Sequence, residues 1–199
     1  MRHPRGLRVG FLLFDDVELL DFAGPLQVLS SAQYVDHSII DSIDTISNKT
    51  TIKVSKTTIE IKVDHVIHEG LGYDLLVIPG GFGTRALIKD ESFLILIKSI
   101  INRSEMIATV CTGSLVPAKL GFLSGLKSTT HYAALDLLET TEPKAIVDRS
   151  KRYHDNGKFI IAEGVSAGID MSFYLLKKLW GRKLSDQVRK YIEYYPEKA

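Results

Sequence analysis

The chain of 199 residues lacks several features that define whole classes of protein. It has one cysteine, so it cannot form an internal disulfide, and we expect a reducing, cytoplasmic setting. It has no apolar run near the roughly 18 residues of a membrane-spanning helix. It also lacks an excess of either charge, since 25 Lys and Arg against 24 Asp and Glu leave a net charge of +1. This balance gives no reason to expect nucleic acid or an anionic membrane as a partner.

What is present is typical of one globular domain. Hydrophobic residues make up 45% of the chain and charged residues 25%, which is enough apolar material for a substantial core. We expect a single domain over residues 1–199 with a core at about 8–194. The basic start at residues 1–6 precedes an apolar run, Val9–Phe14, which lacks a small-residue cleavage site. This run predicts a buried strand rather than a secretory signal.

Apolar strand patterns alternate with helical patterns along the chain, which predicts βαβ units and a mostly parallel sheet covered by helices on both faces. The expected fold is therefore a three-layer α/β/α sandwich. Ser47-Asn48-Lys49 is a candidate hairpin turn, and Asn156-Gly157 is a strong one. The predicted strands are 9–14, 38–46, 51–54, 57–63, 74–78, 106–110, 127–130, 145–148, 152–154 and 159–162. The predicted helices are 19–32, 86–89, 93–102, 115–120, 169–180 and 183–194.

The single cysteine, Cys111, lies where a predicted strand turns into a helix. Met106–Val110 is rich in β formers, and Thr112-Gly113-Ser114 follows directly. A nucleophile-type residue between a strand and a Gly-containing helix start indicates a nucleophile elbow. A helix N-terminus would favour the thiolate over the thiol. The alternative is a buried, inert cysteine acting as a small hydrophobe.

Asp21 is a candidate acid for this site. It stands among large apolar residues just after the first predicted strand. Burial would raise its pKa and suit it to proton transfer. The alternative is that Asp21 only caps the following helix.

The glycines Gly80 and Gly81 end another buried strand, in Pro79–Arg85. They allow the backbone to approach a ligand, and we expect the Gly81 and Thr112 amides to stabilise developing negative charge. Phe82 is a candidate for the pocket wall. A tight strand-to-helix turn would also explain the glycines.

His131, in Thr129–Tyr132, is a third candidate, able to assist a thiolate or to orient a substrate. A structural histidine is the more frequent case. His65 and His68 are weak metal candidates because no cysteine accompanies them. We expect neither a metal nor an organic cofactor.

Six sequence blocks, taken together, resemble the ThiJ/PfpI superfamily, which has a flavodoxin-like, glutamine amidotransferase-like fold. Their order and spacing are more specific than any one block, and the resemblance covers the chain from about Arg8 to Tyr194. The blocks are residues 12–14, 21–25, 79–85, 110–114, 129–131 and 166–170.

Within the superfamily, the Cys-Thr-Gly-Ser block and the Asp-x-x-Gly-Pro block most resemble isocyanide hydratases. The protease-like and glyoxalase-like branches commonly have histidine directly after the cysteine, where this chain has Thr112. The same domain forms the N-terminal half of many AraC-type regulators, but we expect no room for their DNA-binding helices before Ala199. Pro117 in the helix after the elbow is atypical.

The resemblance implies that Cys111 attacks the terminal carbon of a small isocyanide and forms a thioimidate. Asp21 would donate a proton to the substrate and later help to activate water, releasing an N-substituted formamide. The resemblance also implies a homodimer. Two alternatives stay open: a non-catalytic redox-sensing or ligand-binding domain with an accessible, low-pKa cysteine, and a glyoxalase-like or deglycase-like enzyme that acts on α-oxoaldehydes.

Overall fold

The computed structural model describes residues 6–196. Residues 1–5 and 197–199, which include most of the basic start of the chain and both ends of the expected domain, lie outside the described part. The strands are β1 (Leu7–Leu12), β2 (Ile40–Ser47), β3 (Thr51–Lys53), β4 (Glu60–Lys62), β5 (His65–Val66), β6 (Leu75–Ile78), β7 (Met106–Val110), β8 (Lys127–Ser128), β9 (Ile146–Val147), β10 (Tyr153–Asp155) and β11 (Phe159–Ala162). The α-helices are α1 (Leu19–Val35), α2 (Thr84–Leu87), α3 (Glu91–Arg103), α4 (Leu115–Lys119), α5 (Leu135–Thr141), α6 (Ala167–Trp180) and α7 (Arg182–Tyr191), with 3-10 turns at Cys111–Ser114 and Tyr132–Ala134.

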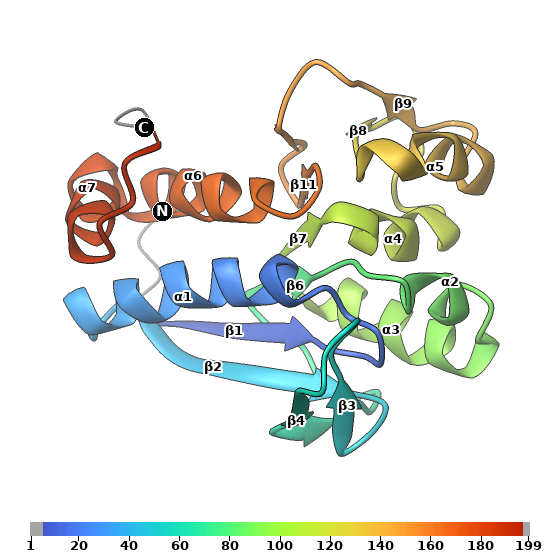
Figure 1. Cartoon of the computed structure of the whole chain (residues 1–199), viewed down its shortest axis with the longest axis horizontal. Coiled ribbons are helices and arrows are strands. Elements are labelled where there is room, and N and C mark those ends of the chain that lie inside the picture. The colour runs from blue at the N-terminus through green and yellow to red at the C-terminus, as the bar shows by residue number, and fades with distance from the viewer. Residues whose placement is uncertain (1–5, 197–199) are drawn as a thin grey trace.

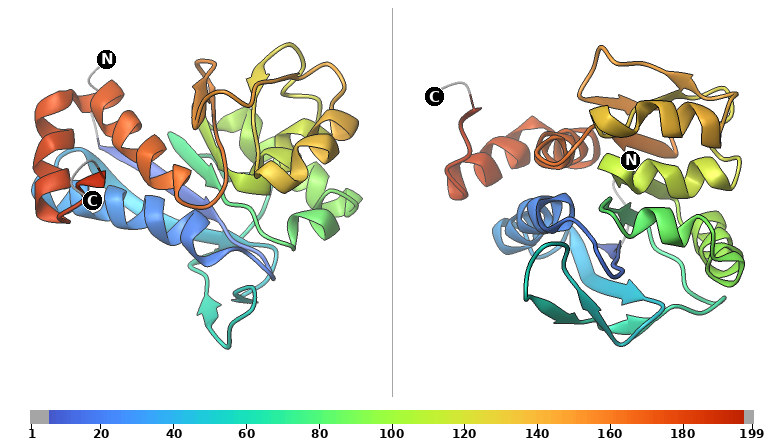
Figure 2. Two further views of the ribbon diagram at one scale, coloured as in Figure 1. Left: turned by 45° about the horizontal axis from the view of Figure 1, so that its top comes forward. Right: turned by 45° about the vertical axis from the view of Figure 1, so that its right-hand side comes forward.

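A mostly parallel sheet forms the centre of the molecule. Its strand order is β10-β11-β7-β6-β1-β2-β5, and only the β10–β11 pair is antiparallel. Figure 1 shows the helices around this sheet, and Figure 2 shows α1, α6 and α7 together on one side with α3 and α4 on the other. The expected α/β/α sandwich with a mostly parallel sheet is confirmed.

The local sequence explains why these elements form. Every residue of β6 and β11 is buried, as expected for central strands covered by helices on both faces. In α3, Phe93, Ile97, Ile100 and Ile101 are buried at the spacing of one helical face. The Asp90 side chain caps this helix by accepting a hydrogen bond from the Phe93 N–H at 3.0 Å.

Four neighbouring parallel strands bring their carboxyl ends to one edge of the sheet. In the order β11-β7-β6-β1, these ends lead into residues 163–165, Cys111, Pro79–Gly81 and the segment before α1. Segments far apart in the sequence therefore meet at the edge where open α/β sheets bind ligands.

The prediction of a hairpin turn at Ser47-Asn48-Lys49 is wrong. β2 pairs in parallel with β1 and with β5, so both of its edges are occupied and it has no edge left for β3. The hairpin forms instead between β3 and β4. The Ser55 N–H donates to the Val17 carbonyl at 2.9 Å, which attaches this hairpin to the loop after β1. The second expected hairpin, around Asn156-Gly157, is confirmed as β10–β11.

Within residues 6–196, no helix has both the length and the apolar character that crossing a membrane requires.

Candidate active site

Cys111 occupies the tight turn directly after β7. Its φ of 57° lies in the left-handed region, which is uncommon for a residue other than glycine. Strained backbone of this kind concentrates at functional sites. The Cys111 N–H donates to the Glu163 carbonyl at 2.8 Å, and the Thr130 hydroxyl donates to the Cys111 carbonyl at 2.9 Å. The predicted elbow is therefore present and is held from both sides.

Asp21 lies in the first turn of α1, and its carboxyl binds a residue outside this helix. Glu18 is the N-cap residue of α1, so the alternative that Asp21 caps this helix is wrong. Asp21 Oδ2 accepts a hydrogen bond from the Gly80 N–H at 2.9 Å, on the loop after β6. The side chain is fully buried, and Oδ1 has no partner at hydrogen-bond distance and angle. A buried carboxyl with an unsatisfied oxygen is expensive, which marks it as a functional group.

Asp21 and Cys111 interact with each other, although the contact does not reach the geometry of a standard hydrogen bond. Burial raises the pKa of Asp21 to about 7, despite the opposing effect of the Gly80 N–H, and nearby Glu18 raises it further. Burial also raises the pKa of Cys111 to about 12, and the charge of Asp21 adds to this shift. At neutral pH the pair therefore holds one to two protons, and the sulfur is a thiol.

The expectation that a helix N-terminus favours the thiolate of Cys111 is wrong, because the pKa of this thiol is raised. Cys111 is only 5% exposed. The segment after it is one 3-10 turn followed by α4, which has five residues including Pro117. So short a helix has a weak dipole, and the loss of solvation together with the neighbouring carboxylate outweighs it.

Thr112 links the loops that follow β6 and β7. Its Oγ1 accepts the Gly81 N–H at 2.9 Å and lies 3.1 Å from the Thr84 hydroxyl. The Thr112 N–H interacts with the Cys111 sulfur and lowers the pKa of the thiol, against the larger effect of burial. Thr112 is thus buried beside the nucleophile, as the sequence indicates.

The Gly81 amide, expected with that of Thr112 to stabilise negative charge, already has a partner, as does the Gly80 amide. The Gly80 N–H is donated to Asp21, and the Gly81 N–H to Thr112. A Cβ on Gly80 would lie 2.5 Å from Thr112 N and 2.9 Å from Asp21 Oδ2, so glycine is required here by a close approach. In this structure the two amides position Asp21 and Thr112, and only displacement of the Thr112 hydroxyl would free the Gly81 N–H for a ligand.

Val165 is a site residue that the sequence reasoning missed. It follows β11 with a φ of 46°, which is strained for a β-branched residue. Its N–H interacts with both the Asp21 carboxyl and the Cys111 sulfur and lowers the pKa of each. The available signal was its place after a buried strand, because parallel neighbours end at the same edge.

A cavity of about 180 Å³ opens onto Cys111. His131 and Phe82 belong to its wall, as predicted. The Nδ1 of His131 accepts the Ala133 N–H at 3.3 Å, and no hydrogen bond joins His131 to Cys111 or Asp21 in the described residues. The lining residues are Glu18, Lys56, Gly81, Phe82, Arg85, Cys111, Thr112, His131, Ala133 and Val165.

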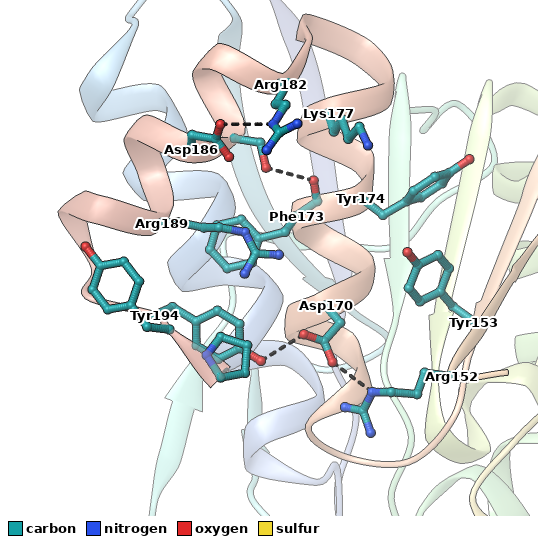
Figure 3. Close-up of a pocket in the computed structure, with 13 residues that line it drawn as sticks. Arg152, Tyr153, Asp170, Phe173, Tyr174, Lys177, Arg182, Asp186, Arg189 and Tyr194 are labelled. Carbon is teal, nitrogen blue, oxygen red and sulfur yellow. Dashed lines mark hydrogen bonds and ion pairs between the residues drawn. The ribbon is translucent and has the colours of Figure 1, made fainter. Parts of the chain in front are cut away.

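A larger hollow, of about 740 Å³, lies elsewhere, between α6 and α7 (Figure 3). Its carboxylates are paired: Asp170 accepts from Arg152 Nε and from Tyr194 Oη, each at 2.8 Å, and Asp186 lies 3.4 Å from Arg182 Nε. This hollow contains no cysteine, so we assign the chemistry to the smaller cavity at Cys111.

A metal site is not found in the described residues, where no three His, Cys, Asp or Glu side chains gather closely enough to hold an ion. His65 and His68 are both exposed.

The arrangement is suited to adding a thiol across a small electrophile. The sulfur can give its proton to the adjacent Asp21 carboxylate while it attacks, and Asp21 can pass that proton to the substrate. Both groups are buried, which strengthens the electrostatic interaction between them.

Comparison with known proteins shows what the chain as a whole is similar to. The chain is 34% identical to the isonitrile hydratase of Pseudomonas putida over 191 residues, which cover 96% of this chain and 79% of that protein. It is 23% identical to the transcriptional regulator GbdR of Pseudomonas aeruginosa over 97% of this chain, but it spans only 52% of the regulator.

Solved structures with the same fold agree with the topology. A ThiJ/PfpI family protein from Pseudomonas syringae superposes with a TM-score of 0.85, at 23% identity, covering 96% of this chain and 76% of that chain. Drosophila melanogaster DJ-1beta superposes with a TM-score of 0.80, at 20% identity, covering 96% and 99% of the two chains.

The DJ-1/PfpI family profile matches residues 7–178, a range that contains the Cys111 turn, Asp21 and both glycine loops. The strand-end arrangement at the sheet edge, the elbow and this match lead to one conclusion: the chain belongs to the DJ-1/PfpI (ThiJ/PfpI) family.

Proposed function

We propose that the protein is an isocyanide hydratase, which adds water to a small isocyanide and releases an N-substituted formamide. The observation that carries the proposal is the buried pair of Asp21 and Cys111, in which a carboxyl with a pKa raised to about 7 stands beside a protonated thiol. The identity of 34% with isonitrile hydratase over 96% of the chain supports it.

The first chemical step adds the S–H bond across the terminal carbon of R–N≡C. The Asp21 carboxylate takes the thiol proton as the sulfur bonds to that carbon, and the same proton then passes to the carbon. The product is the thioimidate R–N=CH–S–Cys111. One proton is thus moved twice and none is taken from solvent, which suits a pair that shares a single proton above pH 7.

The second step hydrolyses the thioimidate. A water adds to the same carbon with Asp21 as the base, the nitrogen gains a proton, and the C–S bond breaks to release R–NH–CHO. The thiol of Cys111 is restored. Overall, one isocyanide and one water give one formamide, so no cofactor is required.

The occupied glycine amides favour this reaction over one on an α-oxoaldehyde. Attack on a carbonyl places negative charge on oxygen at once and requires donors aimed at it. The Gly80 and Gly81 amides instead donate to Asp21 and Thr112. Attack on an isocyanide places the charge on carbon, where the Asp21 proton can neutralise it.

A substrate panel tests the proposal. The protein is incubated with methyl isocyanoacetate and, separately, with methylglyoxal, and products are identified by mass spectrometry. The control is the same protein alkylated at Cys111, its only thiol. We expect formamide from the isocyanide with the untreated protein alone. Consumption of methylglyoxal without formamide would instead support the glyoxalase-like reaction, and saturable binding without turnover would support a ligand-binding regulator.

We further propose that the chain forms a homodimer. Tyr34, Tyr191 and Tyr195 are exposed near α1 and α7, and Tyr34 lies against Tyr191 with ring centroids 5.1 Å apart. Aromatic side chains are enriched at protein interfaces. Tyr194, by contrast, stacks on Phe173 within its own chain. Light scattering after size exclusion tests the proposal, and a mass of one chain at micromolar concentration would contradict it.

A further inference from the structure

Two cations flank the aromatic ring in the wall of the Cys111 cavity. Lys56 Nζ lies 4.8 Å from the centroid of the Phe82 ring, and Arg85 Cζ lies 5.6 Å from it. Lys56, Phe82 and Arg85 all line the cavity that reaches Cys111. Phe82 is 55% exposed, so the ring and the two charges form part of the cavity mouth rather than of the core.

Hydrogen bonds fix the backbone next to both cations. Lys56 is in the β3–β4 turn with a φ of 56°. This hairpin is fixed to the loop after β1, because the Asp16 N–H donates to the Lys53 carbonyl at 2.8 Å and the Ser55 N–H donates to the Val17 carbonyl at 2.9 Å. Arg85 lies in α2, and the Thr84 hydroxyl before it donates to the Gly81 carbonyl at 2.8 Å.

The two cations lack a counter-charge. In residues 6–196 neither Lys56 nor Arg85 has a carboxylate within ion-pair distance, whereas Lys49 and Arg152 each have one. Among the residues that the structure describes, Glu18 is the only carboxylate in the cavity wall and forms no ion pair with either cation. An unpaired Arg and an unpaired Lys beside a reactive cavity attract an anionic group on a ligand.

We propose that the substrate carries a carboxylate, which Arg85 and Lys56 bind at the cavity mouth while its isocyano carbon meets Cys111. This inference rests on the proposed hydratase function. The short chain between the two groups of the substrate packs on Phe82. Arg85 recognises the carboxylate through its planar fork of N–H donors, and Lys56 adds a mobile point charge. Neither Arg85 nor Lys56 touches the reacting atoms. Their role is therefore to select the substrate and not to take part in the chemical steps.

The first test compares isocyanoacetate with its neutral methyl ester, measuring kcat/KM for formamide production. We expect the wild-type protein to prefer the acid over the ester by roughly tenfold, a modest factor for partly exposed ion pairs. Arg85→Gln and Lys56→Gln should each lower kcat/KM for the acid more than for the ester, so that this preference falls. Lys89→Gln is the matched control, since Lys89 is exposed near α2 and does not line the cavity. Equal kcat/KM for acid and ester in the wild type would overturn the inference.

The second test does not depend on hydration. Cys111, as the only thiol, is alkylated with iodoacetate and with iodoacetamide, and the ratio of the two rates is compared with the ratio for glutathione. We expect the anionic reagent to be favoured relative to glutathione, and the preference to fall in Arg85→Gln and Lys56→Gln but not in Lys89→Gln. If no isocyanide is hydrated but this preference holds, the hydratase function fails and anion recognition stands. If hydration occurs and neither test shows a preference for the anion, the function stands and the inference fails.

Discussion

Asp21 and Cys111 lie on different elements, 90 positions apart in the sequence, and each shifts the pKa of the other in an opposite direction. The Asp21 charge raises the pKa of the thiol, and the thiol in turn acts as a donor that moderates the pKa of Asp21. The Gly80 N–H fixes the carboxyl from one side, and the Val165 N–H interacts with both groups. The proposed hydration depends on the proton that Asp21 and Cys111 share.

The pH dependence of hydration follows from the two pKa values. Below about pH 7 both groups are protonated, so no base is present to accept the thiol proton. Above about pH 7 Asp21 is ionised and the thiol stays protonated up to about pH 12. We therefore expect kcat/KM to rise with pH through about 7 and then to level off. A measured profile that falls with rising pH over this range would contradict the assignment of Asp21 as the base.

Asp21→Asn should make the thiol more acidic while reducing turnover. The amide removes the charge that raises the pKa of Cys111, so the apparent pKa from the pH dependence of iodoacetamide alkylation should fall. Hydration should drop by about 10² to 10⁴, the usual contribution of a general acid–base group. An unchanged alkylation profile together with full activity would show that Asp21 does not act on the sulfur.

The same variant should alter the dependence of stability on pH. The pKa of Asp21 is raised in the folded state from 3.8 to about 7, so the folded protein holds this proton more tightly than the unfolded chain. The contribution of this proton to the free energy of unfolding is therefore complete below pH 4 and is lost as the pH rises through 7. Against Asp21→Asn, the free energy of unfolding should fall by roughly 4 kcal/mol across this range. Denaturant titrations at several pH values measure the free energy of unfolding of both proteins. A difference between them that does not change with pH would contradict a raised pKa of Asp21 in the folded state.

Thr112→Val should destabilise the loops around the site. The hydroxyl accepts the Gly81 N–H at 2.9 Å, and valine leaves that donor without its partner. We expect a loss of about 1–3 kcal/mol in the free energy of unfolding, together with slower hydration. Thr112→Ser is the matched control because it keeps the hydroxyl and should retain most of both properties. Equal unfolding free energies for the two variants would show that the hydrogen bond contributes little.

The sequence indicated the elbow because Met106–Val110 is rich in β formers and small residues follow Cys111, and both properties are local. It also suggested Asp21 from its apolar neighbours. The hydrogen bond from the Gly80 N–H to Asp21 could not be predicted, because this contact depends on the order of β1 and β6 in the sheet. The hairpin error at Ser47–Lys49 has the same origin, since the parallel partners of β2 are distant in the sequence.

Val165 and Lys56 were missed for a related reason. Each has a positive φ without being glycine, and no local pattern marks such a residue when the surrounding tertiary structure imposes the conformation. The expected thiolate was wrong because burial, which the sequence does not quantify, outweighs the dipole of one short helix.

Formamide production by Cys111→Ser, compared with the wild type under the same conditions, tests the central claim most directly. Serine keeps the shape of the side chain and removes the sulfur nucleophile, and far-UV circular dichroism checks that the variant is folded. The account predicts formamide from methyl isocyanoacetate with the wild type and none above the uncatalysed rate with Cys111→Ser. A folded Cys111→Ser protein that hydrates the isocyanide at the wild-type rate would contradict it.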